Sequence, residues 1–155
     1  MNRPFPAYSG TKPFVFISYS HRDSERVFAE ISWLKDQGVN IWYDEGIEAG
    51  REWRDEIASA ISGAKVLIYF VTPNSVGSEN CRNEVNFAAD EQIPIVTVYL
   101  EPAELTGGLR LTLSNRQAIK RFELSGEEYA VKLLGFLQSY LPLSDFDGSL
   151  LPDTN

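Results

Sequence analysis

The sequence predicts an α/β fold in which helices cover both faces of a five-stranded parallel sheet. Short runs of apolar, β-branched and aromatic residues recur along the chain, and segments with apolar residues at helical spacing separate them. The runs are apolar at nearly every position, which is typical of strands buried on both faces. Because short links join strands and helices in alternation, we expect right-handed crossovers and a flavodoxin-like three-layer architecture.

The first half of the chain is expected to hold three strands and two helices. The strands are the apolar runs at 14–18, 39–43 and 65–72. Gly38 and Gly63 follow the two helical segments as terminators. The helices are predicted from apolar residues at helical spacing, which are Val27, Ile31 and Leu34, then Trp53, Ile57 and Ile61.

The second half is expected to hold two further strands and two further helices. A helix at 79–90 precedes a strand at 95–100, and a loop-like segment then leads to a weak strand at 118–122. The last helix begins at the capping box formed by Ser125 and Glu128. It is predicted to run to about residue 141 and to face inward with Leu133, Leu134, Leu137 and Tyr140.

The chain length of 155 residues suits a single domain. We place this domain at residues 12–142, after an N-terminal extension at residues 1–11. The segment 143–155 follows Pro142 and is typical of a tail, or of a truncated linker to a further module.

The charge and the apolar content restrict the partners. With 14 basic and 22 acidic residues the net charge is −8, which argues against binding nucleic acid or anionic lipid by bulk electrostatics. No apolar run approaches the roughly 20 residues that span a bilayer. The single cysteine, Cys81, forms no internal disulfide and suits a reducing compartment. We therefore expect a cytoplasmic domain that binds neither nucleic acid nor membrane.

The inventory of reactive residues excludes several kinds of active site. His21 is the only histidine and Cys81 the only cysteine, so the chain holds no His/Cys zinc set and no hydrolase relay with a second histidine. It also lacks the GxGxxG and P-loop patterns. Any chemistry must rest on carboxylates, hydroxyls, aromatic rings and backbone groups, with no metal.

Three polar loops are the places to seek a site. In parallel sheets of this architecture, ligands bind beyond the carboxyl ends of the strands. The loops that leave those ends are 18–23, 43–53 and 72–80, and all three are polar.

These loops, in this order, resemble the TIR (Toll/interleukin receptor) domain family. The matching pieces are FISYSHRD at 16–23, IWYDEGIEAGREW at 41–53 and VTPNSVGSENCRNEV at 71–85. The similarity runs from about Lys12 to Pro142, and its style is that of bacterial TIR domains, which are commonly fused to sensing modules in antiviral defence.

The resemblance implies an activity and a catalytic residue. In the catalytic branch of the family, the domain cleaves NAD+ between nicotinamide and ribose with one glutamate on the helix after the third strand. That glutamate is Glu84 here. The resemblance also implies NAD+ as substrate with no separate cofactor, a linear or cyclic ADP-ribose product, and assembly with other TIR domains.

A single carboxylate suits this chemistry on independent grounds. Ordinary glycosidases use two carboxyl groups, one of which protonates the leaving oxygen. Nicotinamide departs from a cationic pyridinium as a neutral molecule and needs no proton. One ionised carboxylate that faces the developing oxocarbenium therefore suffices, and the amino end of a helix favours that charge on Glu84.

The other candidate residues follow from their loops. Tyr19, Ser20 and His21 either line the nucleotide cleft or serve the turn and the helix cap. Asp44 and Glu45 either contact ribose or face water. Trp53 either stacks on adenine or begins the apolar stripe of its helix, and the continuation of that stripe favours packing.

The loop at 44–53 is the candidate self-association element. It carries one apolar residue, Ile47, among acids, and Gly46 and Gly50 let the backbone adjust. We expect Ile47 to dock onto a neighbouring domain.

Two other functions compete with NAD+ cleavage. A non-catalytic TIR adaptor would only associate with other TIR domains, and Asn80, where the family usually has an aromatic residue, favours this alternative. A phospho-receiver of similar architecture needs acidic residues where this chain has Ser18, Tyr19 and Thr72, and it is set aside.

Overall fold

Five parallel strands form the centre of the molecule. The computed structural model describes residues 3–45 and 51–143. The strand order is β2-β1-β3-β4-β5, and every neighbouring pair is parallel. This confirms the predicted five-stranded, flavodoxin-like sheet. The strands are β1 (Val15–Ser18), β2 (Ile41–Tyr43), β3 (Val66–Val71), β4 (Ile95–Tyr99) and β5 (Gln117–Lys120).

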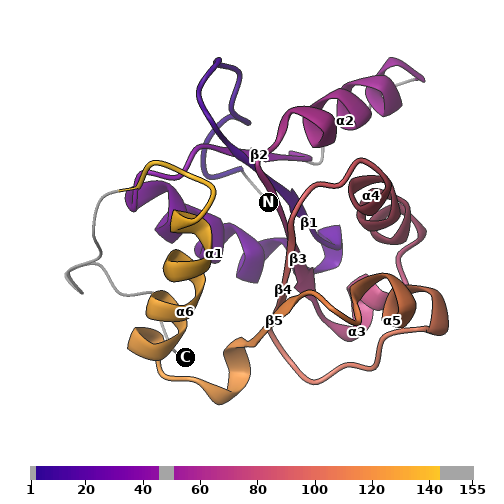
Figure 1. Ribbon diagram of the computed structural model, residues 1–155, viewed down its shortest axis with the longest axis vertical. Helices are drawn as coiled ribbons and strands as arrows, with labels where there is room; N and C mark the ends of the chain where they lie inside the picture. Colours follow the sequence, from indigo (N-terminus) through magenta and orange to yellow (C-terminus); the bar gives the residue numbers. More distant parts are fainter. Residues whose placement is uncertain (1–2, 46–50, 144–155) are drawn as a thin grey trace.

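Helices cover both faces of the sheet. Figure 1 shows α1 and α6 on one side and α2, α4 and α5 on the other, as predicted for a three-layer fold. None of the helices in the described part of the chain has the length and hydropathy required to cross a bilayer. The helices are α1 (Ser24–Asp36), α2 (Arg51–Gly63), α3 (Pro73–Val76), α4 (Glu79–Asp90), α5 (Gly107–Leu113) and α6 (Gly126–Gln138), with 3-10 turns η1 (His21–Asp23) and η2 (Arg121–Glu123).

Strands β1 to β4 contribute side chains to two separate cores, because successive side chains of a strand point to opposite faces, whereas β5 contributes only Ile119 to one of them. On β1, Ile17 packs in the core beneath α1 and α6, whereas Phe16 packs in the core beneath α2, α4 and α5. All six residues of β3 are buried. The apolar runs therefore identify strands covered on both sides, as the sequence indicates.

The terminator of α1 is the predicted glycine. Gly38 has a φ of +91°, a conformation that residues with a Cβ rarely adopt. Its N–H donates to the carbonyl of Lys35 at 2.9 Å, which satisfies one of the last helical carbonyls.

The N-terminal segment packs beside the edge strand β2. The N–H of Tyr8 donates to the carbonyl of Ile41 at 2.8 Å, and the ring of Phe5 lies 5.3 Å from that of Tyr43. Residues of the expected extension thus cover a sheet edge whose backbone groups need partners.

The structure corrects the expected elements at several points. Residues 73–76 form α3 and residues 107–113 form α5, where loops were predicted, and β5 ends at Lys120, with η2 beginning at the next residue. Tyr140, predicted to face inward, is 41% exposed; it lies beyond α6, which ends at Gln138, and its ring packs near that of Phe136.

Candidate functional site

The candidate site lies at the carboxyl edge of the sheet. Here the chain leaves the neighbouring strands β1 and β3 toward opposite helical layers. Ser18 is the last residue of β1, Asp44 follows β2, and Glu84 lies on the second turn of α4. The topology thus brings together residues that are 26 to 66 positions apart in the sequence. This is the switch point at which ligands bind in open α/β sheets.

Two cavities meet at this edge and share Asp44, Asn80 and Glu84. The smaller cavity has a volume of about 180 Å³, and the larger one about 460 Å³. The smaller is lined by Ile17, Tyr19, Ser20, His21, Arg22, Asp44, Ser78, Asn80 and Glu84. The larger is lined by Asp44, Trp53, Arg54, Ile57, Ala58, Ile61, Asn80, Asn83, Glu84 and Phe87. We call the two together the cleft.

Glu84 is held by a residue that the sequence analysis did not select. The hydroxyl of Ser18, which is fully buried, donates to Glu84 Oε1 at 2.8 Å. Burial raises the pKa of Glu84 to about 7, and the negative charge of Asp44 adds to the rise, while Ser18 and His21 oppose it. The sequence analysis expected the helix end to favour the charge of Glu84; desolvation acts in the opposite direction and raises the pKa of this carboxyl.

His21 and Asp44 form a pair on the wall of the smaller cavity. His21 Nε2 lies 3.2 Å from Asp44 Oδ2, and this hydrogen bond raises the pKa of His21. The hydroxyl of Tyr19 donates to the backbone carbonyl of Asp44, and its ring lies 5.1 Å from that of His21. Burial raises the pKa of Tyr19, so its hydroxyl stays neutral. Tyr19, His21 and Asp44 all line the cleft.

Ser20 combines its two predicted roles. Its hydroxyl accepts a hydrogen bond from the backbone N–H of Arg22 at 3.3 Å and so caps η1. It also lines the smaller cavity. The cap and the cleft wall are the same side chain.

Glu45 does not line the cleft, so the structure does not place it for ribose contact, which was one of its two expected roles. Its carboxylate accepts hydrogen bonds from the backbone N–H of Ala7 at 2.6 Å and from the side chain of Arg3. Neighbouring residues of this segment alternate in direction, so Asp44 faces the cleft and Glu45 faces the N-terminal segment. Its role in the structure is to hold that segment.

Trp53 both packs and lines the larger cavity. It is partly buried, with its ring 5.7 Å from that of Trp42, which is itself in the core. Together with Phe87 it gives the larger cavity an aromatic wall. Gly46, Ile47 and Gly50, the expected self-association loop, lie outside the described residues.

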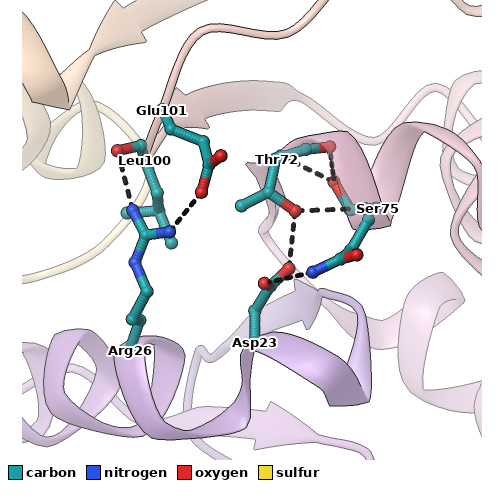
Figure 2. Close-up of polar contacts among 7 residues, drawn as sticks. Asp23, Arg26, Thr72, Ser75, Leu100 and Glu101 are labelled. Carbon is teal, nitrogen blue, oxygen red and sulfur yellow. Dashed lines mark hydrogen bonds and ion pairs between the residues drawn. The ribbon is translucent and has the colours of Figure 1, made fainter.

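A polar network joins two of the loops that form the cleft. Asp23 is buried, and its Oδ2 accepts the hydroxyl of Thr72 at 2.5 Å while its Oδ1 accepts the amide of Asn74 at 2.9 Å. Figure 2 shows Asp23 beneath Thr72 and Ser75, which form the capping box of α3. The network fixes the loop after β1 to the loop after β3, and hence His21 relative to α4. The sequence offers little indication of this network, because Asp23 stands where an aspartate that caps the following helix is expected.

Arg26 forms the neighbouring contacts in Figure 2. Its guanidinium donates to the carbonyl of Leu100 at 2.8 Å and to Glu101 Oε2 at 2.5 Å. Neither Arg26 nor Glu101 lines the cleft. Over residues 3–45 and 51–143, no group of three or more His, Cys, Asp or Glu side chains is arranged to hold a metal ion.

The fold and the cleft define an α/β domain with a carboxylate at the junction of two cavities. A family model for the TIR domain (TIR_2) matches residues 15–134. The chain therefore belongs to the TIR domain family. No curated protein matches its sequence.

Solved structures share the fold at low sequence identity. The TIR domain of the Toll-related receptor TRR-2 from Hydra magnipapillata has a TM-score of 0.64 at 16% identity, over 81% of this chain and 96% of that one. The CMP N-glycosidase BcmB of Clostridium botulinum has a TM-score of 0.54 at 15% identity, over 78% of this chain and 97% of that one. The TIR domains of the activated Roq1 resistosome, which recognises the effector XopQ, have a TM-score of 0.51 at 17% identity, over 84% of this chain and 82% of that one.

The raised pKa of Glu84 predicts a pH-dependent stability difference. The folded state binds this proton more tightly than the unfolded chain, so the free energy of unfolding falls as pH rises from about 4.5 to about 7. Glu84→Gln lacks this titration. We expect the free energy of unfolding of Glu84→Gln, relative to that of wild type, to increase by up to about 3 kcal/mol as the pH rises over that range.

Urea unfolding of wild type and Glu84→Gln at pH 4.5 and pH 8 measures this difference. A stability difference that is the same at both pH values would show that the Glu84 carboxyl is not desolvated.

Proposed function

We propose that this TIR domain hydrolyses NAD+ at the bond between nicotinamide and ribose, with Glu84 as the catalytic carboxylate. The product is ADP-ribose or a cyclic ADP-ribose. The observation that carries the proposal is the position of Glu84, which lies at the junction of the two cavities and is held there by the buried Ser18. A neighbour of similar fold is described as a CMP N-glycosidase, which supports cleavage of an N-glycosidic bond on this architecture.

The electrostatics of the cleft suit a cationic substrate. Glu84 is partly protonated near neutral pH, because burial raises its pKa to about 7. A bound nicotinamide cation lowers that pKa and restores the charge. The ionised carboxylate then stabilises the positive charge that moves onto the ribose as the C1′–N bond breaks, and neutral nicotinamide leaves.

The two cavities can hold the two halves of a dinucleotide. The smaller one offers hydroxyl, carboxylate and imidazole groups from Ser20, Asp44 and His21, which suit a ribose. The larger one offers the aromatic rings of Trp53 and Phe87, which suit a base. In this arrangement the reactive ribose lies beside Glu84.

Purified chain, incubated with NAD+ at high protein concentration and resolved by chromatography, tests the activity. We expect nicotinamide to appear in equal amount to ADP-ribose or its cyclic form. Intact NAD+ after prolonged incubation of assembled protein would contradict the proposal.

We also propose that the domain acts in the cytoplasm as part of a bacterial antiviral defence protein, through self-assembly and with a fused sensor module. The neighbour whose TIR domains form part of a resistosome supports the role of assembly.

Assembly predicts that activity depends on concentration. We expect the rate per molecule to fall on dilution, because a site completed between neighbouring domains is lost when they dissociate. Turnover and light scattering measured over the same dilution series test this. A constant rate per molecule with a monomeric mass throughout would remove assembly from the mechanism.

The alternative function is that of a TIR adaptor without catalysis. It is favoured by Asn80, which places an exposed amide at the junction of the two cavities, where family members usually have an aromatic residue. An adaptor would form TIR–TIR assemblies in light scattering while leaving NAD+ intact in the same sample.

A further inference from the structure

The cleft contains a second acid–base group opposite Glu84. His21 Nε2 and Asp44 Oδ2 lie 3.2 Å apart, and both residues line the smaller cavity together with Glu84. The charge of Asp44 raises the pKa of Glu84, and the charge of Glu84 raises that of His21, so the groups interact across this cavity. The function of Glu84 proposed above uses neither partner of the pair as an acid or a base.

Hydrolysis of NAD+ needs a proton acceptor at a step after nicotinamide has left. In the first step the C1′–N bond breaks, its electron pair goes to nicotinamide, and no proton moves. In the second step a lone pair of water forms the C1′–O bond, and one O–H bond of that water must break. Its proton needs an acceptor beside the ribose, and such assistance typically contributes a rate factor of about 10² to 10⁴.

We propose that the His21–Asp44 pair accepts this proton and so activates the water that hydrolyses the ribosyl cation. This inference rests on the proposed NAD+ cleavage. The imidazole acts in its neutral form, which the positive charge of the adjacent ribosyl cation favours against the effect of the two carboxylates. When Asp44 accepts the Nε2–H of neutral His21, the lone pair lies on Nδ1, which takes the proton from water. The imidazolium that forms is stabilised by Asp44, as in other His–carboxylate pairs.

Three features of the pair suit this role. The side chain of His21 is 50% exposed, so the proton can pass on to solvent. Tyr19 fixes both partners, since its hydroxyl bonds the backbone of Asp44 and its ring packs on His21. Glu84 can then remain ionised opposite the cation, because it does not have to take up the proton of water.

The pair should therefore control how the ribosyl cation is shared between water and another nucleophile. A pyridine base such as 3-acetylpyridine attacks through its nitrogen lone pair and releases no proton. Loss of the proton acceptor slows attack by water and spares attack by the pyridine. The ratio of base exchange to hydrolysis is thus a readout that a purely structural role would not move.

The experiment uses assembled protein with NAD+ and 3-acetylpyridine, and it measures the exchanged dinucleotide and ADP-ribose by chromatography. We expect Asp44→Asn and His21→Gln each to raise the ratio of exchange to hydrolysis by about tenfold or more. Glu101→Gln serves as the matched control, because Glu101 also pairs with a basic side chain at this edge of the sheet but lies outside the cleft. The ratio of exchange to hydrolysis in Glu101→Gln should equal that of wild type.

The outcomes separate this inference from the proposed function. An unchanged ratio in both cleft variants, with folding verified by thermal melting, would overturn the role of the pair while leaving NAD+ cleavage intact. Loss of exchange and hydrolysis together would place the pair before formation of the cation and would also contradict the inference. Failure of wild type to release nicotinamide at all would overturn the proposed function, and this inference with it.

Discussion

Glu84→Gln is expected to lower NAD+ cleavage by a factor of about 10² to 10³, because glutamine keeps the shape of the side chain and lacks the charge that stabilises the oxocarbenium. The amide can still accept the hydrogen bond from Ser18, so the cleft should keep its geometry. Release of nicotinamide, measured at saturating NAD+ on assembled protein, gives the size of the effect.

The matched control for this variant is Glu79→Gln on the same helix. Glu79 lies in the first turn of α4, is exposed, and lines neither cavity. It should retain the wild-type rate. Near wild-type turnover in Glu84→Gln would mean that another group provides the catalytic charge.

Glu30→Gln is expected to have the largest effect on stability, a loss of about 3 to 5 kcal/mol in the free energy of unfolding. Arg121 Nε lies 3.3 Å from both carboxylate oxygens of Glu30, and the two side chains are only 9% and 11% exposed. The guanidinium also lies over the ring of Tyr129, 4.5 Å from its centroid. The loss is expected because the charged Arg121 is left buried without a carboxylate partner.

Thermal melting measures this effect. For a chain of this size we expect the melting temperature of Glu30→Gln to fall by about 10 °C. Glu101→Gln breaks the exposed pair with Arg26 and should cost about 1 kcal/mol or less. The double change Glu30→Leu with Arg121→Leu should recover much of the loss, because no buried charge remains. A melting temperature of Glu30→Gln equal to that of Glu101→Gln would contradict the burial of the pair.

Hydrophobic patterning predicted the sheet well because four of its strands are buried on both faces, and the exposed β5 gave the weak signal. The predicted helix at 79–90 coincides with α4, since Val85 and Ala88 lie on one buried stripe. α5 was missed because it begins with Gly107 and Gly108. Each glycine in a helix is less favourable than alanine by about 1 kcal/mol. The available signal was the spacing of Leu109 and Leu113, which are four residues apart and both buried.

The candidate site was predictable in its residue types and only partly in its contacts. The rule that ligands bind at strand carboxyl ends identified Tyr19, His21 and Asp44. The Ser18 contact to Glu84 joins residues 66 positions apart and depends on how α4 sits over β1, which local patterns do not specify. The orientation of Glu45 depends in the same way on the N-terminal segment beside β2.

Three substrates distinguish a cationic leaving group from a neutral one. NAD+, NADH and CMP are incubated separately with assembled protein at equal concentration, and the released base is measured by chromatography. We expect release from NAD+ to be far faster than from the other two, because its nicotinamide leaves as a neutral molecule without a proton, whereas the reduced nicotinamide of NADH and the cytosine of CMP carry no positive charge and need protonation to leave. Release from NADH or CMP at a rate similar to that from NAD+, or no release from NAD+, would contradict this expectation.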